Sequence, residues 1–435
     1  MNQAPESLLF KNATALLGGG KYLTHAVVTT DCGKISYIGD KIPENNGKYR
    51  VIDCRSGLLM PGFYNIHCHS PMTLFRGIGE DLPLQRWLNE KIYPAEDRLT
   101  HESVYTGTKL AAAEMIRGGV VSFSDMYFFC EETAKAVLET GMKANIGRCL
   151  VSFDENDTVA GNERFEDAVK LRENCQNAGD GRIKVDMSVH AEYTNKEKFL
   201  REVADYTNEN DLGMQVHVSE TELEHKECIE RHGMTPVEFL ARTGILTNRA
   251  TAAHCVWVTD NDMALLSQLG VTVAHNPVSN LKLASGVAPV EKLISAGINV
   301  GLGTDGAASN NRLSVIRELQ TAALIHKGVT RRADVIDTWR FFDMATENGA
   351  KAQGRDDCGK LEIGKKADIC LIDIDELNNI PMFDPYSALA FSVDPKDVRM
   401  TVCDGRVLYE DGEYKTIDVE KLRHEAKYTI EHYFD

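Results

Sequence analysis

The sequence lacks the features that mark disulfide-rich, secreted and membrane-spanning proteins. Its 11 cysteines are odd in number, form no Cys-x-x-Cys pair and stand scattered in apolar runs. Such cysteines are typical of reduced core thiols, so we expect no disulfide framework. No apolar run reaches 18 residues, and no basic segment leads into an apolar stretch at the start. We therefore expect a cytoplasmic protein without a membrane span or secretory signal.

Basic charge is also in short supply. The chain has 48 Lys and Arg against 65 Asp and Glu, a net charge of −17. A field of that sign repels a phosphate backbone or an anionic membrane surface, so neither is an expected partner. A small molecule can still be held by a few local basic groups. With 43% hydrophobic and 26% charged residues, the composition excludes a disordered or fibrous chain.

The middle of the chain, residues 58–364, alternates short apolar strands with amphipathic helical patterns such as residues 101–117 and 260–269. The eight expected strands are residues 58–69, 120–126, 144–151, 184–190, 213–218, 250–255, 271–275 and 298–303. Eight strand–helix units over about 300 residues are the pattern of a (β/α)₈ barrel. We predict a TIM-like barrel over residues 58–364.

The two ends of the chain are rich in strand and turn signals. Residues 26–40 and 367–409 contain β-branched and aromatic runs separated by turns. Neither end alone has enough strands to bury a core. We therefore predict an α/β protein in which residues 1–57 and 365–435 together form a small composite β-sandwich domain beside the barrel.

Metal-binding side chains fall at the ends of the predicted barrel strands, where barrel enzymes place their active groups. In His67-Cys68-His69, strand geometry puts residues i and i+2 on one face, so both imidazoles can reach one ion. His217 and Asp305 end later strands and can supply further ligands. Neutral imidazole and carboxylate bind zinc, and a catalytic zinc site keeps one position open for water. The spacing predicts a metal site.

Three more residues bear on this chemistry. Glu220, three residues after His217, either carries a proton to a substrate nitrogen or is a first-turn acid of the next helix. His254 either hydrogen-bonds the water on the metal or satisfies polarity in the core. A second ion would need a further bridging ligand, often a carbamate-modified lysine at the end of the fourth strand. Lys184 is the only lysine of that strand and stands at its start, the wrong end for this role. We expect one metal ion.

Six motifs together resemble a known family. They are PGFYNIHCH (61–69), PMTLFRG (71–77), EDL (80–82), AHCV (253–256), HNPVSNLKL (275–283) and GTDGAASNN (303–311). The chain is similar over essentially its whole length to the amidohydrolase superfamily, in particular to its 5′-methylthioadenosine/S-adenosylhomocysteine deaminases. The resemblance implies a metal-dependent enzyme that hydrolytically deaminates an adenosine derivative, giving the inosine analogue and ammonia.

The resemblance also implies roles for single residues. The implied metal ligands are His67, His69, His217 and Asp305. Glu220 matches the acid that protonates the purine ring, and His254 matches the residue that orients the attacking water. Asp305 is expected to take the proton of that water.

Five further positions match groups that face the substrate in the family. Trp87 and Glu96 match residues near the ribose, and His190 matches a histidine that binds the base. Arg148 and Arg164 match arginines that face the substrate tail, and a guanidinium can grip a carboxylate such as that of homocysteine. Read without the family, the arginines could form surface ion pairs, and Trp87 could belong to a buried helix face.

Several alternatives stay open at this point. The same site could serve an aminohydrolase or chlorohydrolase of another N-heterocycle, such as guanine, a pterin or a triazine, or a non-catalytic nucleoside-binding protein. Zinc is the expected ion, but iron or manganese suits the same ligands. The expected partner is a small-molecule nucleoside. A homo-oligomer stays open, as does the choice among methylthioadenosine, S-adenosylhomocysteine and adenosine.

Overall fold

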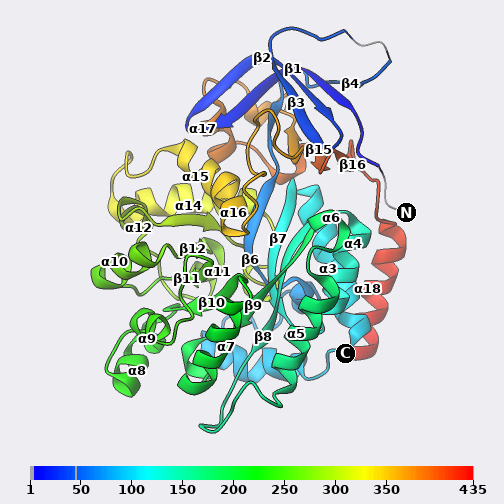
Figure 1. Cartoon of the computed structure of the whole chain (residues 1–435). Helices are drawn as coiled ribbons and strands as arrows, with labels where there is room; N and C mark the ends of the chain where they lie inside the picture. The colour runs from blue at the N-terminus through cyan, green and yellow to red at the C-terminus, as the bar shows by residue number, and fades with distance from the viewer. Residues whose placement is uncertain (1–3, 45–46, 435) are drawn as a thin grey trace.

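The structure, a computed structural model, describes residues 4–44 and 47–434 and contains two sheets. An eight-stranded barrel occupies the middle of the molecule, and a second sheet lies at one end of it (Figure 1). The predicted α/β class and the (β/α)₈ barrel are confirmed. No helix of the described residues is long and apolar enough to cross a membrane.

Eight parallel strands follow one another around the barrel in chain order. They are β6 (Phe63–Cys68), β7 (Val120–Tyr127), β8 (Lys143–Leu150), β9 (Ile183–Val189), β10 (Met214–Val218), β11 (Ala250–His254), β12 (Thr272–His275) and β13 (Asn299–Leu302). The last strand returns to the first where the backbone N–H groups of Thr304 and Asp305 donate to the carbonyl of His67, at 3.1 and 3.0 Å. The barrel therefore closes at the residues that carry the predicted metal ligands.

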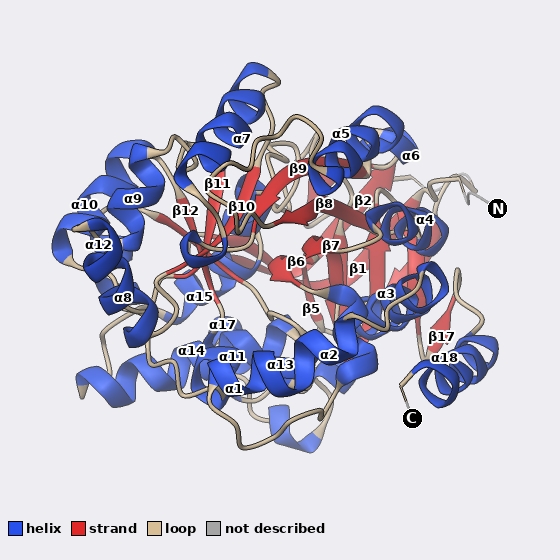
Figure 2. Ribbon diagram, turned by 90° about the horizontal axis from the view of Figure 1, so that it is seen from below, coloured by secondary structure: helices blue, strands red, loops and turns tan. Residues whose placement is uncertain are grey.

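Helices surround these strands on the outside (Figure 2). The longer ones are α3 (His101–Arg117), α4 (Cys130–Thr140), α5 (Glu163–Cys175), α7 (Glu197–Glu209), α8 (Glu222–His232), α9 (Pro236–Arg242), α10 (Asp260–Leu269), α14 (Val315–Thr330) and α15 (Thr338–Ala345). The bounds of α3 and α10 agree with the predicted helices to the residue. Both begin after a threonine, Thr100 or Thr259, whose side chain accepts the N–H three residues on.

Short helical segments follow several strands and join the longer helices. They are η1 (Ser70–Phe75), α1 (Leu84–Trp87), η2 (Leu88–Ile92), α2 (Tyr93–Glu96), α6 (Ala178–Gly181), η3 (Glu192–Thr194), α11 (Pro277–Lys282), α12 (Val290–Ser295), α13 (Ala307–Asn310), α16 (Glu347–Ala352), η4 (Leu377–Asn379), α17 (Pro385–Phe391) and η5 (Pro395–Asp397). The segment from η1 to α2 lies between β6 and α3 and lines much of the cavity described below.

The second sheet combines strands from both chain ends, as the sequence predicts. Its nine strands are β1 (Leu8–Gly18), β2 (Lys21–Asp31), β3 (Lys34–Gly39), β4 (Arg50–Asp53), β5 (Leu58–Pro61), β14 (Ile369–Ile372), β15 (Val398–Cys403), β16 (Arg406–Glu410) and β17 (Glu413–Tyr414). Antiparallel pairing of β5 with β14 joins the two ends. Its apolar side chains, among them Phe10, Val28 and Leu371, form a core of their own.

The strand expected over residues 58–69 is divided in two. The N–H of Gly62 donates to Asp368 beside the second sheet, whereas the next N–H, of Phe63, donates to Gly119 beside the barrel. A side chain at Gly62 would overlap with Val121, so only glycine fits this close crossing. Residues 58–61 therefore pair with the second sheet, and the barrel begins at Phe63.

The last helix, α18 (Val419–Tyr433), follows the strands of the C-terminal segment, within residues 365–435 that were predicted to belong to the β-sandwich domain. It lies beside α3 on the outside of the barrel (Figure 1), where the Tyr433 hydroxyl donates to Glu102 at 3.3 Å. After it, the Phe434 ring meets Phe75 edge to face. The division of the chain into domains 1–57 with 365–435, and 58–364, stays a prediction.

A buried ionic cluster ties the barrel to the second sheet. The ammonium of Lys143, at the start of β8, lies 2.6 Å from Asp368 and 2.8 Å from Asp404. The hydroxyl of Tyr64 in β6 donates to the same Asp368 at 2.6 Å. All four side chains are buried, and such a cluster fixes the relative position of the two sheets because a lost partner would leave a buried charge unpaired.

Candidate active site

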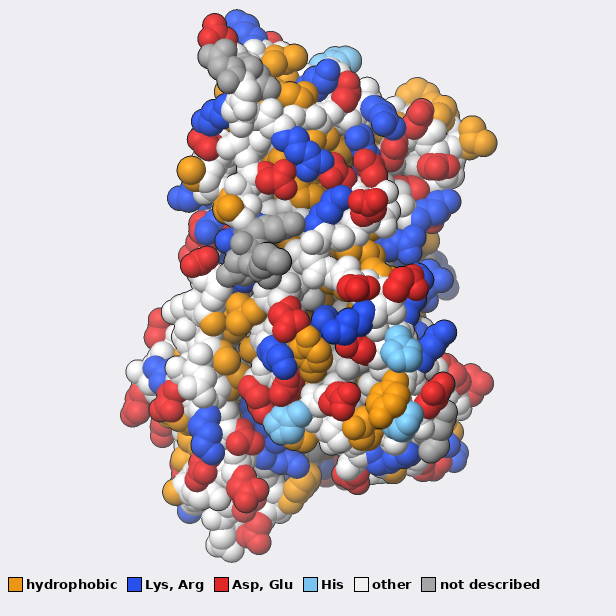
Figure 3. Space-filling model, turned by 90° about the vertical axis from the view of Figure 1, so that its right-hand side faces the viewer, with side chains coloured by type: hydrophobic (Ala, Val, Ile, Leu, Met, Phe, Trp, Pro, Cys, Tyr) orange, Lys and Arg blue, Asp and Glu red, His pale blue; other side chains and the backbone are white. Residues whose placement is uncertain are grey.

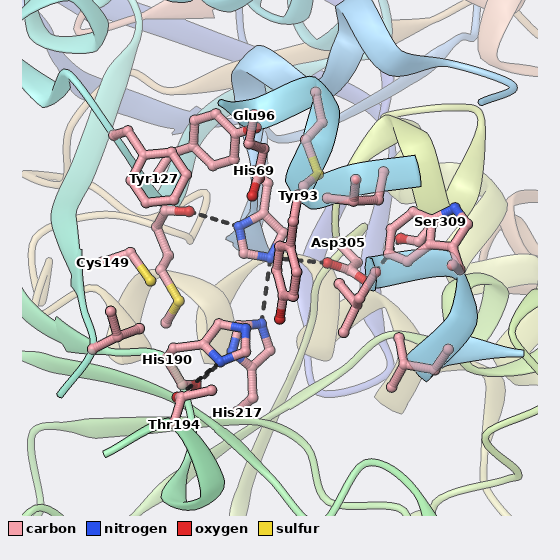
Figure 4. A pocket seen from close by; sticks show the side chains of 18 of the residues that line it. His69, Tyr93, Glu96, Tyr127, Cys149, His190, Thr194, His217, Asp305 and Ser309 are labelled. Carbon is pink, nitrogen blue, oxygen red and sulfur yellow. Dashed lines mark hydrogen bonds and ion pairs between the residues drawn. The ribbon is translucent and has the colours of Figure 1, made fainter. Parts of the chain in front are cut away.

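The four predicted metal ligands come together at the carboxyl ends of the barrel strands. His67 lies in β6, His69 directly after it, His217 in β10 and Asp305 after β13. One ligand atom from each lies within 4.8 Å of all the others. Nε2 of His69 is 3.1 Å from Oδ1 of Asp305 and 3.3 Å from Nε2 of His217 (Figure 4).

The backbone fixes which nitrogen of two of these histidines faces the centre. Nδ1 of His69 lies 2.6 Å from the carbonyl of Met126, and Nδ1 of His217 lies 2.7 Å from that of His190. A carbonyl only accepts, so both Nδ1 atoms carry a proton and both rings turn Nε2 inward. Burial opposes the charge on His69, but Asp305 raises its pKa to about 9, so a metal ion would take the place of a proton on that Nε2. Two Nε2 atoms that face each other at 3.3 Å are held either by a shared proton or by a metal ion between them.

His67 presents the same need in another form. Its Nε2 is buried, has no hydrogen-bond partner among the described residues and lies 3.5 Å from Oδ1 of Asp305. Burial lowers the pKa of His67 to about 4, so the ring is neutral at pH 7 and can act as a ligand. A buried nitrogen without a partner is unfavourable, and a metal ion would satisfy it.

Asp305 is held by its neighbours so that one oxygen stays free for the cluster. The hydroxyls of Ser279 and Ser309 donate to Oδ2 at 2.6 and 2.8 Å, which leaves Oδ1 toward the histidines. Its backbone is left-handed, with φ 59°, a strained conformation for a residue other than glycine. The hydrogen bond from the backbone N–H of Asp305 to the carbonyl of His67 maintains that turn.

The spacing of the four ligand atoms suits a single small ion. Two atoms each about 2.1 Å from one tetrahedral ion lie about 3.4 Å apart, and the separations of 3.1, 3.3 and 3.5 Å agree with that value. Lys184 begins β9 at the opposite end of the barrel, where its ammonium donates to the carbonyl of Gly354. The donor set therefore fits one metal ion.

Glu220 lies beside this cluster in a buried turn after β10. Ser285 donates to its Oε1 at 3.1 Å, and Oε2 lies 3.8 Å from Nε2 of His254. The carboxylate of Glu224 receives the backbone N–H groups of Ser219 and Glu220, at 2.8 and 2.7 Å, and so holds the turn. Burial raises the pKa of Glu220, which favours proton uptake.

His254 ends β11 with its ring turned toward Glu220 and the metal ligands. Its Nδ1 lies 2.8 Å from Oδ1 of Asn280 in α11 and 3.3 Å from the amide of Asn276. Donation from Nδ1 to Asn280 leaves Nε2 as the free acceptor on the cavity side. Its backbone φ of 73° is left-handed, and backbone strain of this kind gathers at functional sites.

A cavity of about 500 Å³ opens above these groups. Figure 4 shows Glu96 and Tyr127 on one side of His69, with His190 and His217 on the other, and Tyr93 between His69 and Asp305. All the predicted substrate residues line it: Trp87, Glu96, Arg148, Arg164 and His190. His275 is absent from the lining, and its ring bonds instead to His326 of α14 at 3.1 Å.

Trp87 and Glu96, which the sequence predicts near a ribose, come from short helices between β6 and α3. The indole N–H of Trp87 donates to the carbonyl of Ile78 at 3.1 Å, so its apolar ring faces the cavity without a free donor. Burial raises the pKa of Glu96 to about 7. In its ionised form, the Glu96 carboxylate can accept hydrogen bonds from hydroxyl groups of a ligand.

Two arginines flank one aromatic ring at the edge of the cavity. The guanidinium of Arg148 lies 5.0 Å from the centre of the Phe128 ring, and that of Arg164 lies 5.8 Å from it. Burial and the charge of Arg148 lower the pKa of Arg164. Arg148 lies 3.8 Å from Asp167, which is half exposed. Two close cations form a favourable place for an anion.

His190, after β9, forms another part of the cavity wall. Its Nδ1 and the hydroxyl of Thr194 form a hydrogen bond of 3.1 Å, and its ring lies 5.0 Å from that of His217. Burial lowers the pKa of His190 to about 4, so the ring is neutral. A neutral imidazole with one nitrogen directed into a cavity can hydrogen-bond a heterocycle.

Sequence reasoning gave no role to several residues that hold the site. Ser279, Asn280 and Ser309 lie inside motifs singled out above, but only the fold shows that they bond Asp305 and His254. Tyr93 and Tyr127 also line the cavity. Tyr127 ends a barrel strand, and that position is the signal that could have selected it.

Comparison with known proteins agrees with this geometry. A model of the amidohydrolase family matches residues 58–408. The chain belongs to the amidohydrolase family. The family predicted from the six motifs is therefore confirmed, and the four-ligand cluster of this amidohydrolase lies within the matched region.

Similar proteins include several deaminases. The 5-methylthioadenosine/S-adenosylhomocysteine deaminase of Dictyoglomus thermophilum is 45% identical to this amidohydrolase over 379 residues, 87% of this chain and 88% of the relative. The 5′-deoxyadenosine deaminase of Methanosarcina acetivorans is 42% identical over 409 residues, 94% of each chain. A solved structure of an adenosine deaminase from Xanthomonas campestris with bound zinc shares 31% identity and a TM-score of 0.90 over 98% of both chains.

Proposed function

We propose that this amidohydrolase is a hydrolytic deaminase of adenosine derivatives, with 5′-methylthioadenosine and S-adenosylhomocysteine as substrates. The products are the inosine analogue and ammonia. The observation that carries the proposal is the pair Glu220 and His254, 3.8 Å apart in one cavity with the four-ligand cluster. The names of the relatives at 45% and 42% identity support the substrate class.

One divalent ion belongs to this proposal. Its ligands would be His67, His69, His217 and Asp305. We propose zinc, because the similar adenosine deaminase from Xanthomonas campestris contains it, although iron and manganese accept the same donors. When bound, such an ion supplies a water molecule whose pKa is lowered toward about 7.

Asp305 and Glu220 transfer the protons of the reaction, and His254 orients the water. His254, fixed through Asn280, offers Nε2 as an acceptor that holds the attacking water in line with C6 of the purine. Asp305, one of the four proposed ligands, takes a proton from that water, and Ser279 and Ser309 hold its carboxylate in place. Glu220, with its pKa raised by burial, delivers a proton to ring nitrogen N1, because Ser285 binds only its other oxygen.

The remaining lining residues account for the nucleoside. The carboxylate of Glu96 would accept ribose hydroxyls, the ring of Trp87 would pack against the sugar, and His190 would hydrogen-bond the base. Arg148 and Arg164 would bind a carboxylate such as that of homocysteine in a bidentate way. A substrate without that carboxylate, such as methylthioadenosine, would use the first three contacts alone.

Other ring systems fit the same metal site less well. The relatives at 42% identity and above are named for adenosine-type substrates, and Glu96, a carboxylate that lines the cavity, is the group we propose for the ribose hydroxyls. Guanine, a pterin or a triazine has no ribose hydroxyl to use it. A non-catalytic nucleoside-binding protein would have no use for the buried acid Glu220 beside His254.

A coupled ammonia assay tests the proposed function. The panel is methylthioadenosine, S-adenosylhomocysteine, adenosine and 5′-deoxyadenosine, with guanine and a triazine as controls. We expect one ammonia per adenine ring consumed and none from the controls. Ammonia from guanine or the triazine alone would reverse the substrate class, and nucleoside binding without ammonia would show a binding protein.

The proposal includes a small-molecule partner and a cytoplasmic location. All 11 cysteines are unpaired and most are buried, as expected for a reducing compartment. On the face shown in Figure 3, Lys and Arg are interspersed with Asp and Glu, and the net charge of −17 disfavours nucleic acid and anionic membranes. Fractionation tests the location, and light scattering of the purified chain gives its oligomeric state.

A further inference from the structure

Tyr127 carries a buried hydroxyl that the reaction so far does not use. The residue ends β7 directly after Met126, whose carbonyl holds His69. Its side chain is 2% exposed, lines the cavity, and its hydroxyl has no hydrogen-bond partner among the described residues. Burying a hydroxyl without a partner is unfavourable, and such groups in native proteins call for an explanation.

The surroundings of that hydroxyl point to Glu96. The Tyr127 ring lies 4.9 Å from the Phe128 ring and 6.1 Å from the His69 ring, so residues directly after β7 and β6 flank it. Burial is the largest cause of the raised pKa of Tyr127, and the charge of Glu96 is the next largest. Figure 4 shows Tyr127 and Glu96 on the same side of the cavity.

Glu96 has the complementary need. It ends α2 and is free of ion pairs within the described ranges, although His69, Asp97 and Arg164 act on it from a distance. Burial raises the pKa of Glu96 to about 7, whereas the Tyr127 hydroxyl acts to lower it. A carboxylate on a four-residue helix, with no partner that fixes its rotation, would bind two hydroxyls in a defined geometry only if a donor oriented it.

On the basis of the proposed function, we propose that Tyr127 is a positioning residue for the ribose of the substrate. Its hydroxyl donates to one oxygen of Glu96 when substrate binds and leaves the other oxygen to accept the ribose hydroxyls. The phenol is well suited to this task because its ring is packed between β6 and the Phe128 side chain. The carboxylate is thereby oriented as the nucleoside binds.

This arrangement predicts selectivity that depends on the ribose hydroxyls. A nucleoside without them leaves the oriented oxygen of Glu96 buried and unsatisfied, and polar groups in that state reject the wrong ligand strongly. Removal of the Tyr127 hydroxyl should therefore matter for a ribonucleoside and matter little for its dideoxy analogue. A merely structural role would affect the two substrates alike.

The first experiment compares Tyr127→Phe with the native chain on adenosine and on 2′,3′-dideoxyadenosine. We expect kcat/KM for adenosine to fall by about tenfold, the effect of one lost hydrogen bond, and that for the dideoxy analogue to change by less than about twofold. Tyr105→Phe, on the exposed face of α3, is the matched control and should change neither. Equal losses on both substrates, or no loss on adenosine, would overturn the proposal.

A second experiment guards against a folding artefact. In Glu96→Gln, the further change Tyr127→Phe should have almost no effect on kcat/KM for adenosine, because the oriented carboxylate is already gone. Additive effects of the two substitutions would refute the proposal. The ligand-free Tyr127→Phe chain should unfold at the same temperature as the native chain or higher, since it loses an unpartnered hydroxyl, and a clearly lower temperature would also count against it.

These outcomes are separate from failure of the proposed function. If the native chain releases no ammonia from any adenine nucleoside, the deaminase proposal is wrong, and the inference about Tyr127 falls with it. If the native chain deaminates adenosine but Tyr127→Phe acts equally on both substrates, the deaminase proposal stands and only the role of Tyr127 is wrong.

Discussion

The Nε2 atoms of His69 and His217 face each other at 3.3 Å, while the Nδ1–H group of each ring donates a hydrogen bond to a backbone carbonyl. One carbonyl belongs to Met126, the residue before the last in β7, and the other to His190, which follows β9. The barrel backbone therefore presets both rings as metal ligands before any ion arrives. This second set of bonds distinguishes the cluster from a chance gathering of polar side chains.

Loss of one ligand should abolish metal retention. His217→Ala should bind the ion about 100-fold more weakly or worse, since even outer partners of a ligand contribute 10- to 100-fold. Elemental analysis after dialysis measures the change, and His424→Ala on the exposed face of α18 is the control. A His217→Ala chain that keeps one ion would show that the cluster is not the binding site.

Substitution of the buried acid should separate chemistry from metal binding. Glu220→Gln keeps the shape and the bond from Ser285 but cannot deliver a proton. We expect kcat to fall by about 10²- to 10⁴-fold, the usual contribution of a general acid, with the metal content unchanged. Glu222→Gln, an exposed position two residues on, should retain full activity. Near-normal turnover in metal-loaded Glu220→Gln would remove Glu220 from the mechanism.

The two arginines should matter for one substrate and not the other. Arg164→Met removes half of the cationic pair at Phe128. We expect kcat/KM for S-adenosylhomocysteine to fall by about 10- to 100-fold, as when one charged hydrogen bond is lost. The value for methylthioadenosine, which has no carboxylate, should change by about twofold or less. Equal losses on both substrates would mean that the arginines hold the cavity wall rather than a substrate carboxylate.

The buried cluster between barrel and sheet should dominate a stability measurement. Asp368→Asn leaves Lys143 without its main partner, and we expect a loss of about 3–5 kcal/mol in unfolding free energy. Chemical denaturation measures it, with exposed Asp260→Asn as a control that should cost less than about 0.5 kcal/mol. A loss for Asp368→Asn as small as for the control would exclude the cluster as a tie.

The same carboxylate sets a pH dependence of known sign. Burial opposes ionisation of Asp368, but the charge of Lys143 more than offsets it and lowers the pKa to about 2. The unfolded value is about 3.9, so this contribution is complete above that pH and is lost as pH falls toward 2. Repeating the denaturation at low pH checks it, and the difference between native and Asp368→Asn should shrink there.

The metal ligands could be found from the sequence because they depend on local rules. Two histidines at i and i+2 share a face of any strand, and parallel barrel strands all bring their ends to one rim. The starts of α3 and α10 also depend on a local signal, because Thr100 and Thr259 cap these helices. The prediction that strands from the two chain ends pair in one sheet is also confirmed.

What the sequence did not reveal depends on contacts distant in the chain. The strand is divided at Gly62 because of its contacts with Asp368 and Val121, and no local sequence pattern predicts these contacts. The grip of Asn280 on His254 and the isolated hydroxyl of Tyr127 likewise appear only when strands and helices are assembled. Helix α18 has a helical pattern, but its place beside α3 is a matter of packing.

The central claim is that four side chains hold one ion which the deamination requires. The most direct measurement removes the metal by chelation and restores zinc in steps, while ammonia release from methylthioadenosine is recorded against bound metal per chain. We predict that the rate rises in proportion to bound ion and levels off at one per chain. Ammonia release by the metal-free chain, or a rate that keeps rising to two ions per chain, would contradict the account.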